Sequence, residues 1–580
     1  MRRPAVGRVI AAAVAFYAVF VARTSFALDG RRTFTLFDDA MISMTYARNL
    51  ARGHGLVWNA GGTPVEGITN PLWTLVMAVP HALGVPENLT GLFMSAVAAA
   101  CLVGCTVLAR ELVLLVAPGD TAAAAGAAWM TAFCYPLVYW SLRGMEVGLV
   151  TVLVLAGTVL TLRVSTSWSR RDQWLLAAAC VALVSTRLDT VVYVTIFCLY
   201  AGWRLDRVDR ARTLATVGGF TVGAVAAQEL WRHAYYGAWV PNTYTLKVAH
   251  VPLFDRLARG GLGLLAIVLV SMTALLVSAY VAIKRRRGPG SLLLGAIPGA
   301  GAAYSVIVGG DAWEWMHYAN RYLVPGVVVL CCLAAIGAGE LASLVVTRPR
   351  VGRMTAGALT LGAVGVAAGL LPDGHNLVPV DATGAYGLVL APLPVAYLVL
   401  RSGTFVRSSS AALLIAALAF QVSGPALLYW LAGNAVDVDA DETFARYGAL
   451  LGSLTEDDAT VAVVVAGMPI YFADRTGIDL LGKSDPRIAA LGVRAEVGFW
   501  PGHSKWDYDI SILHDRPDVV AQLRLPSDRD LAAIRAAGYV EVRAAAAIGK
   551  RFGVRPAFFV RADSDAIRWD LVERVPPTPG

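Results

Sequence analysis

Charged side chains are scarce in this sequence. Asp, Glu, Lys and Arg together make up 16% of its 580 residues, whereas about a quarter is usual in soluble globular domains. Hydrophobic residues account for 57%, and the mean hydropathy is +0.59. A chain with so few charges cannot be packed as a water-soluble globule. The composition therefore predicts an integral membrane protein.

Cysteine and histidine are too few and too scattered to build a metal site or a disulfide framework. All seven cysteines lie in apolar segments, and none lies in residues 433–580. His54, His233 and His317 stand alone, without metal-ligand spacing. The sequence also lacks a Walker loop and a dinucleotide fingerprint in a strand–turn–helix context. These absences argue against soluble nucleotide-driven chemistry and favour an activated lipid as the energy source.

The charges that are present divide the chain into two parts. Residues 433–580 hold 22 acidic and 17 basic residues, and residues 1–432 hold the other 51 charges with a net charge of +13. We therefore expect a transmembrane domain at 1–432 and a soluble domain at 433–580. The basic residues of the first part cluster in short loops between apolar runs, as the positive-inside rule describes for cytoplasmic loops. Nucleic acid is thus not an expected partner.

Apolar runs of roughly 20 residues predict about thirteen membrane spans. They cover residues 8–28, 88–116, 122–141, 146–163, 174–186, 189–203, 213–231, 260–283, 290–308, 322–346, 354–371, 386–401 and 408–430. With the basic clusters in the cytoplasm, an odd number of crossings places residues 433–580 outside. The alternative for the first run is a signal peptide ending near Ser25-Phe26-Ala27. We expect 70–85 to be interfacial or re-entrant, and 174–203 to form two short helices that meet near the outer face.

Two adjacent aspartates stand in the predicted external loop and juxtamembrane region, residues 29–87. Asp38 and Asp39 precede residues 40–52, whose apolar positions recur near helical spacing and predict an amphipathic helix lying in the membrane interface. One of the two could cap this helix. Neighbouring carboxylates raise each other's pKa, which suits a general base. Asp38 is our candidate base, and Asp39 is a candidate cap, substrate ligand or metal ligand.

On this topology, most of the unusual polar residues between the spans lie on the outer side. Carboxylates can accept hydrogen bonds from sugar hydroxyls, and basic groups suit a lipid-linked phosphate. The acidic candidates are Glu66, Glu146, Asp189 and Asp311, and the basic candidates are Arg143, Arg187, Lys247 and Arg321. Each of these charges alone could equally be a solvated or snorkelling residue at a span end. Their grouping on one side predicts an active surface at the outer lipid boundary.

The order of these motifs is similar to that of the polytopic glycosyltransferases of the GT-C fold, which take a sugar from a polyprenyl-phosphate carrier. The matching pieces are Phe37-Asp38-Asp39, Tyr46-Ala47-Arg48-Asn49-Leu50, Glu66-Gly67 with Asn70-Pro71-Leu72-Trp73, Gly144-Met145-Glu146, Arg187-Leu188-Asp189, Pro241-Asn242-Thr243 with Lys247, and Gly309-Gly310-Asp311 with Arg321. Within the fold, the set resembles actinobacterial cell-wall arabinofuranosyltransferases. Relatives often carry Arg where Thr45 stands and Pro where Leu188 stands, which leaves Arg48, Arg187 and Arg321 as the better phosphate-binding candidates.

The resemblance implies a membrane glycosyltransferase that moves a sugar, with arabinofuranose favoured, from a polyprenyl-phosphate donor to a cell-envelope glycan or glycoprotein. By the family pattern the catalytic aspartate would be Asp38. The implied substrate-binding residues are Glu66, Asn70, Glu146, Arg187, Asp189, Asn242, Lys247, Asp311, Arg321, His503 and Lys505. No cofactor is required, because phosphate is a good leaving group, although a divalent cation is compatible with the chemistry. The expected location is a bacterial plasma membrane, with the active site on the outer face and the oligomeric state left open.

The last part of the chain has a different pattern. Strand-like runs at 461–465, 539–542 and 558–560 alternate with a helical run at 528–537, which predicts a small extracytoplasmic α/β domain. The stretch Gly502-His503-Ser504-Lys505 could bind the acceptor glycan or the donor phosphate, and a plain surface loop is the alternative.

Two other functions fit part of the pattern. A lipid-linked sugar transporter or flippase also needs charges inside a bundle, but it would place them near the bilayer midplane and often in inverted repeats. Here the charges cluster at span ends, and no repeat is visible. A lipid-linked glycan ligase or polymerase could share the fold and the acidic loop while requiring a larger donor cleft.

Overall fold

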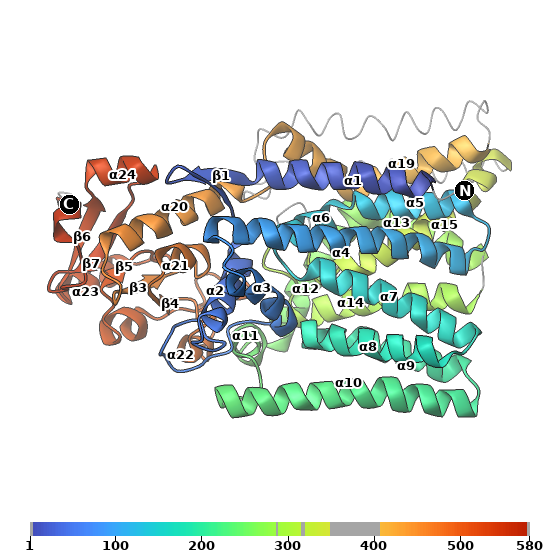
Figure 1. Ribbon diagram of the computed structural model, residues 1–580, viewed down its shortest axis with the longest axis horizontal. Helices are drawn as coiled ribbons and strands as arrows, with labels where there is room; N and C mark the ends of the chain where they lie inside the picture. Colours follow the sequence, from blue (N-terminus) through green and yellow to red (C-terminus); the bar gives the residue numbers. More distant parts are fainter. Residues whose placement is uncertain (1–3, 286–287, 315–319, 348–406, 577–580) are drawn as a thin grey trace.

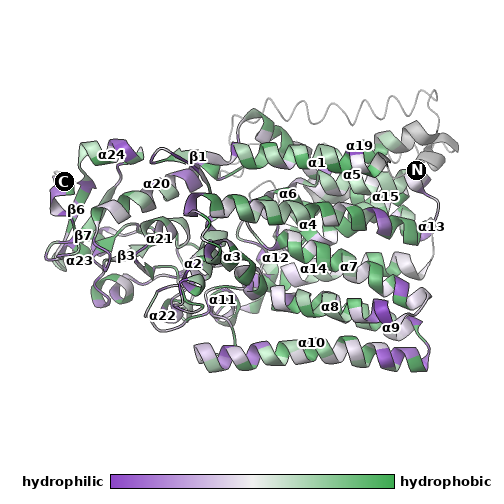
Figure 2. Ribbon diagram, in the orientation of Figure 1, coloured by the Kyte–Doolittle hydropathy of each residue, from purple (hydrophilic) through white to green (hydrophobic). Residues whose placement is uncertain are grey.

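The computed structural model describes residues 4–285, 288–314, 320–347 and 407–576. A bundle of long helices and a mixed α/β domain lie end to end along the long axis of the molecule (Figure 1). Hydrophobic residues dominate the bundle, and hydrophilic residues are more frequent in the α/β domain and at several helix ends (Figure 2). This division matches the uneven distribution of charge along the sequence.

The bundle accounts for most of the described chain before residue 433. Its helices are α1 (Pro4–Arg23), α4 (Glu87–Val116), α5 (Thr121–Ala132), α6 (Tyr135–Leu142), α7 (Val147–Thr166), α8 (Arg170–Thr186), α9 (Val191–Arg204), α10 (Arg207–Tyr236), α12 (Leu253–Ile267), α13 (Thr273–Arg285), α14 (Pro289–Val308), α15 (Val324–Thr347) and α19 (Arg407–Ala432). Large apolar side chains such as Leu199, Val222 and Leu262 are exposed on its outer surface. Surfaces of this kind are stable against lipid, whose tails are as apolar as the side chains.

Five of these helices are long and apolar enough to cross a membrane. Among the described residues they are α1, α4, α7, α14 and α15, and two bent helix pairs bring the total to seven. The chain is therefore a multi-pass membrane protein. Helices also form at the predicted spans 174–186, 189–203, 213–231 and 260–283, but they are shorter or less apolar. The predicted spans 354–371 and 386–401 lie outside the described residues.

The predicted interruption between residues 174 and 203 is confirmed. Helix α8 ends at Thr186, a 3-10 turn occupies Leu188–Thr190, and α9 begins at Val191. The side chains of Arg187 and Asp189 form an ion pair at this break. In an unbroken membrane helix, these two charges would lie in the apolar interior of the bilayer. A helix break allows the charged pair to lie outside that environment.

The first predicted span ends earlier than its apolar run suggests. Helix α1 ends at Arg23, and β1 (Ser25–Leu28) pairs antiparallel with β2 (Arg31–Phe34) instead of extending the helix. The two turn residues, Asp29 and Gly30, have φ values of +48° and +76°, as a two-residue hairpin turn of this kind requires. The expected span at 8–28 is therefore wrong at its end, because apolar residues fill a short hairpin as well as a helix.

Beyond α19 the chain forms a six-stranded sheet with the strand order β4-β3-β5-β7-β6-β8. The elements of this domain are α20 (Val438–Leu454), β3 (Thr460–Val463), α21 (Met468–Ala473), β4 (Thr476–Asp479), α22 (Pro486–Ala489), β5 (Val519–Val520), α23 (Asp528–Ala536), β6 (Tyr539–Ala544), α24 (Ala546–Phe552), β7 (Ala557–Arg561) and β8 (Val572–Arg574). Strand β3 runs parallel to β4 and β5, and the other neighbours are antiparallel. The predicted strands and helix correspond to β3, β6, β7 and α23.

Two short helices, α2 (Asp38–Ala51) and α3 (Pro71–Ala82), lie between the bundle and the α/β domain (Figure 1). Helix α3 has twelve residues, too few to cross a membrane, as predicted. The prediction that α2 lies in the membrane interface is wrong, because eleven of its fourteen residues are buried. Its Arg48 donates a hydrogen bond to the Tyr471 carbonyl at 2.7 Å and pairs with Asp474 at 2.8 Å. The α/β domain therefore covers the polar face that the sequence assigned to lipid headgroups.

Candidate active site

A cavity of about 740 Å³ lies where the helix bundle meets the α/β domain. Segments from α2, the loop before α3, the α8–α9 break, the end of α10 and the loop after β4 all contribute to its wall. Seven of the sequence-predicted site residues line it, namely Asp39, Glu66, Asn70, Arg187, Asp189, Lys247 and Arg321. A volume of this order is typical of sites for small ligands.

Asp39 is the member of the aspartate pair that lines the cavity. Its Oδ1 accepts a hydrogen bond from Lys483 Nζ at 3.1 Å, and its Oδ2 accepts one each from Arg321 and the Trp313 indole at 3.2 Å. Burial would raise the pKa of Asp39, but Lys483 and Arg321 outweigh burial and hold this pKa well below its ordinary value. Asp39 is therefore an ionised carboxylate in contact with two cations.

Asp38 has a different environment. Within the described structure it does not line the cavity, and its Oδ1 accepts a hydrogen bond from the Met468 backbone at 2.7 Å. Burial raises the pKa of Asp38 to about 6, against an opposing effect of Lys483. The alternative that one aspartate caps α2 is wrong, because Phe37 occupies the cap position and both acids lie in the first helical turn. Asp38 instead anchors α2 to the start of α21.

Three cations gather around Asp39: Lys247, Arg321 and Lys483. Lys483 was not predicted from the sequence, although it is one of only five lysines in the chain. It lies in a tight turn after β4. Burial lowers the pKa of Lys247 to about 8, assisted by Arg321. Lys247 makes no hydrogen bond or ion pair within the described residues, which leaves its ammonium group available to a ligand.

Arg321 is held in place by a buried carboxylate. Its Nε and one terminal nitrogen donate to the two oxygens of Asp311, both at 2.9 Å, and its guanidinium lies 5.1 Å from the centre of the Trp140 ring. This bidentate arrangement fixes the plane of the guanidinium while its remaining nitrogen reaches Asp39. Asp311 is almost fully buried and does not line the cavity, so its role is to position Arg321.

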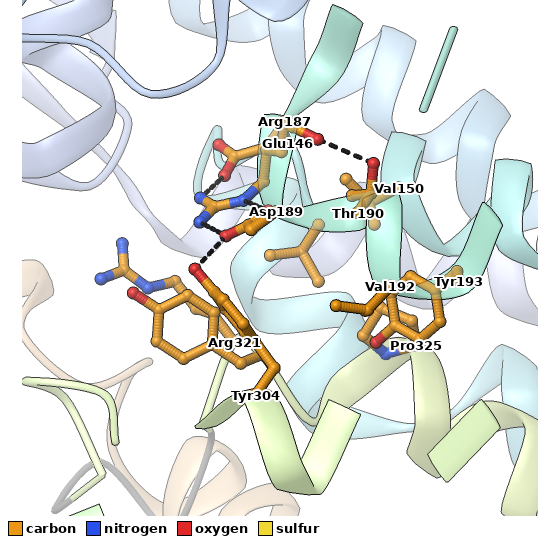
Figure 3. Close-up of a pocket in the computed structure, with 12 residues that line it drawn as sticks. Glu146, Val150, Arg187, Asp189, Thr190, Val192, Tyr193, Tyr304, Arg321 and Pro325 are labelled. Carbon is orange, nitrogen blue, oxygen red and sulfur yellow. Dashed lines mark hydrogen bonds and ion pairs between the residues drawn. The ribbon is translucent and has the colours of Figure 1, made fainter. Parts of the chain in front are cut away.

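Arg187 forms a second ion-pair network in the wall of the cavity, shown in Figure 3. It bonds Glu146 at 2.6 Å and both oxygens of Asp189, at 3.0 and 2.5 Å. Tyr304 donates a further hydrogen bond to Asp189 at 2.7 Å, and Asn70 donates one to Glu146 at 2.8 Å. Glu146 and Asp189, two of the four carboxylates that the sequence offered as sugar ligands, are therefore already engaged with Arg187.

Glu66 also has a partner that the sequence did not reveal. Arg232, near the end of α10, is buried and pairs with both Glu66 and Glu229. Arg232 lies just beyond the predicted span at 213–231, and no motif marked it. Burial raises the pKa of Glu66 despite the hydrogen bond from Arg232.

Three further predicted residues do not line the cavity but pack around the segments that do, namely Asn242, His503 and Lys505. Asn242 donates to the backbone carbonyls of Gly482 and Lys483 at 2.8 and 2.9 Å, which fixes the turn that carries Lys483. His503 stacks on Trp500, and burial lowers its pKa to about 3, so its ring is neutral. Lys505 donates to the Ala489 and Thr245 carbonyls at 2.7 and 3.3 Å and thereby joins α22 to the segment after α11 (Asn242–Tyr244).

A buried ion pair outside the cavity joins the two parts of the protein. Arg143 follows α6, and its fully buried side chain pairs with Asp441 of α20. The Arg143 guanidinium also donates to the Thr35 and Leu36 carbonyls at 3.3 and 3.2 Å. The structure thus places this predicted basic candidate at the junction of the bundle and the α/β domain. No group of three or more His, Cys, Asp or Glu side chains is placed to hold a metal ion in the part of the chain that the structure describes.

Comparison with protein-family models and with curated proteins by sequence gives no match. Among solved structures, the chain is similar to ArnT from Cupriavidus metallidurans bound to undecaprenyl phosphate, with a TM-score of 0.54 and 13% identity over 80% of this chain and 84% of that chain. The apo state of the same protein gives a TM-score of 0.53 and 15% identity over 83% and 86% of the two chains. The chain is therefore a polytopic helical membrane protein with the GT-C fold that its motifs predicted.

Proposed function

We propose that this protein is a glycosyltransferase that moves a sugar from a polyprenyl-phosphate donor to a cell-envelope glycan or glycoprotein. Arabinofuranose is the favoured sugar, on the resemblance of the motifs. The observation that carries the proposal is the group of Lys247, Arg321 and Lys483 around the carboxylate of Asp39, in a cavity at the end of an apolar helix bundle. The fold shared with ArnT, which binds undecaprenyl phosphate, supports the same donor class.

The carboxylate of Asp39 and the three cations around it have the charges that the transfer reaction requires. The acceptor hydroxyl attacks the anomeric carbon, the bond from that carbon to the phosphate oxygen breaks, and polyprenyl phosphate leaves with the electron pair. The hydroxyl proton passes to a carboxylate acting as general base. Cations that contact the phosphate stabilise the charge that develops on it as it departs. Lys247 is the first candidate for this contact because its ammonium group has no other partner among the described residues.

We assign the base to Asp39. It lines the cavity, whereas Asp38 bonds the backbone of α21. The cations that lower the pKa of Asp39 are also those best placed to bind phosphate. A donor that draws Lys483 or Arg321 toward its phosphate would weaken their hold on Asp39 and make this carboxylate a stronger base.

The proposed donor can be tested with purified protein in lipid vesicles. We expect transfer from radiolabelled decaprenyl-phosphoryl arabinose to a panel of neutral oligosaccharide acceptors, and weaker or no transfer from polyprenyl-phosphoryl mannose. Absence of transfer from any polyprenyl monophosphate donor would contradict the proposal. Transfer from a pyrophosphate-linked oligosaccharide alone would indicate a lipid-linked glycan ligase, and movement of the donor across the bilayer without transfer would indicate a transporter.

We further propose that the site faces outward from a bacterial plasma membrane, on the basis of the basic clusters between the helices. A cysteine replacing Lys550, which is exposed on α24, should react with a membrane-impermeant maleimide in intact cells. A cysteine replacing the exposed Arg171, at the opposite helix ends, should react only after lysis. The unmodified protein is the control, because its cysteines lie in the helix bundle. Labelling of position 171 alone in intact cells would reverse the proposed orientation.

A further inference from the structure

The cavity has a second polar region that the proposed chemistry leaves unused. It is formed by the last turns of α10 and the segment that follows, and its lining residues include Gln228, Glu229, Arg232 and Trp239. Together with Glu66, the charged residues here carry a formal charge of −1. The lining charges around Asp39 are Lys247, Arg321 and Lys483 against one carboxylate, which gives +2. An anionic phosphate is therefore attracted to the region around Asp39 and not to the end of α10.

The polar groups of the α10 region have unused hydrogen-bonding capacity. Gln228 makes no hydrogen bond to any other residue that the structure describes. Glu229 uses one oxygen to pair with Arg232, and its other oxygen has no partner within the same residues. A carboxylate and a primary amide together accept and donate hydrogen bonds, which is the combination that binds sugar hydroxyls.

An aromatic ring completes this region. Trp239 is 56% exposed although it is one of the largest apolar side chains of the protein. His233 stacks on it with the ring centres 4.1 Å apart and an angle of 9° between the ring planes. The histidine therefore covers one face of the indole and fixes its orientation. Trp239 is also one of the residues that line the cavity. An open, oriented indole face packs well against the apolar face of a sugar ring.

We propose that Gln228, Glu229 and Trp239 form the acceptor subsite, and that the acceptor is an uncharged, hydroxyl-rich glycan. The inference deepens the proposed function and rests on it, since it names the substrate class of the second half of the same cavity. Glu229 and Gln228 bind hydroxyl groups of the glycan, and Trp239 stacks on one of its rings. The acceptor hydroxyl then approaches Asp39 from the side away from the donor phosphate.

Equilibrium binding to the purified protein in lipid nanodiscs tests the subsite without requiring transfer. The two probes are a neutral oligosaccharide from the acceptor panel and polyprenyl phosphate. For Trp239→Ala we expect the oligosaccharide Kd to rise about five- to tenfold, and for Glu229→Gln about tenfold. The Kd of polyprenyl phosphate should stay within about twofold in both variants, because the phosphate lies near Lys247. Trp239→Phe should restore most of the oligosaccharide affinity.

Trp231, on α10, provides a matched control for Trp239, which lies just after that helix. It is also exposed and stacks on Tyr235, but it does not line the cavity. Trp231→Ala should leave both affinities unchanged. Equal losses in Trp231→Ala and Trp239→Ala would show that Trp239 is only a membrane anchor and would overturn the inference. So would weakened binding of polyprenyl phosphate alone, unchanged binding of both probes, or no oligosaccharide binding by the unmodified protein. A failure of the proposed function can be told apart from a failure of this inference. In that case sugar transfer is absent, whether or not the protein binds the oligosaccharide.

Discussion

Replacing Asp39 with asparagine is expected to lower kcat/KM for sugar transfer by about 10²- to 10⁴-fold, the range that a general base contributes. Asparagine keeps the size of the side chain, but its single acceptor oxygen can keep only the hydrogen bond from Lys483 or those from Arg321 and Trp313. It also cannot take a proton from the acceptor hydroxyl. Initial rates with saturating and limiting acceptor, at constant protein in the membrane, measure the loss. Binding of polyprenyl phosphate should persist in this variant.

Asp38→Asn is the matched control for that experiment. Its amide oxygen can still accept the hydrogen bond from the Met468 backbone, so we expect a loss of no more than about tenfold. The pH dependence separates the two aspartates further. A base whose pKa is held low stays ionised as the pH falls through 6, whereas Asp38, with a pKa of about 6, would become protonated there. A fall in kcat/KM near pH 6 that disappears in Asp38→Asn would assign the base to Asp38.

Lys483→Met is expected to reduce transfer by about 10²- to 10³-fold, comparable to the loss of one group that stabilises transition-state charge. The substitution removes one of the cations that we propose bind the donor phosphate. It also removes one of the two ion pairs that Asp39 makes within the described residues. Without Lys483 the pKa of Asp39 rises toward its ordinary value. The acid limb of the pH profile should therefore move to higher pH, which the loss of a purely structural lysine would not cause.

Two further variants make this result interpretable. Lys550→Met removes an exposed lysine of the same domain and should leave the rate and the pH profile unchanged. Lys483→Arg keeps the charge and should recover part of the activity, with the acid limb close to its original position. An unaltered rate in Lys483→Met would show that Lys483 takes no part in the reaction.

Much of the helical architecture was predictable because its signals are local. Apolar runs marked α4, α7, α14 and α15, and the Arg187–Asp189 interruption marked the break between α8 and α9. The order of the short motifs indicated the fold. Burial of α2 was not predictable, because its pattern of apolar and polar residues is the same whether lipid headgroups or a protein domain cover its polar side. Only the position of α21 decides between them.

In the candidate site, too, some residues could be predicted from local signals and others could not. The sequence identified Asp39, Lys247 and Arg321 by residue type and order, but Lys483 and Arg232 carried no motif. Lys483 lies 444 positions from Asp39 in the chain, and their contact exists only because the fold brings the turn after β4 to α2. The sequence analysis chose Asp38 as the candidate base, but local spacing does not show which of the two adjacent aspartates lines a cavity. Successive helical positions point about 100° apart, so one faces α21 and the other faces the cavity.

The sequence by itself determined that this chain belongs in a membrane, that its charge is divided between a bundle and a terminal domain, and that a set of acidic and basic residues lies at span ends. These properties follow from composition and from local spacing. The tertiary structure decided which charges are already paired, which aspartate lines the cavity, and which residues of the terminal domain complete it. These facts depend on contacts between segments that are distant in the chain. The cation that pairs with a given carboxylate can come from any part of the sequence, so local spacing does not identify it.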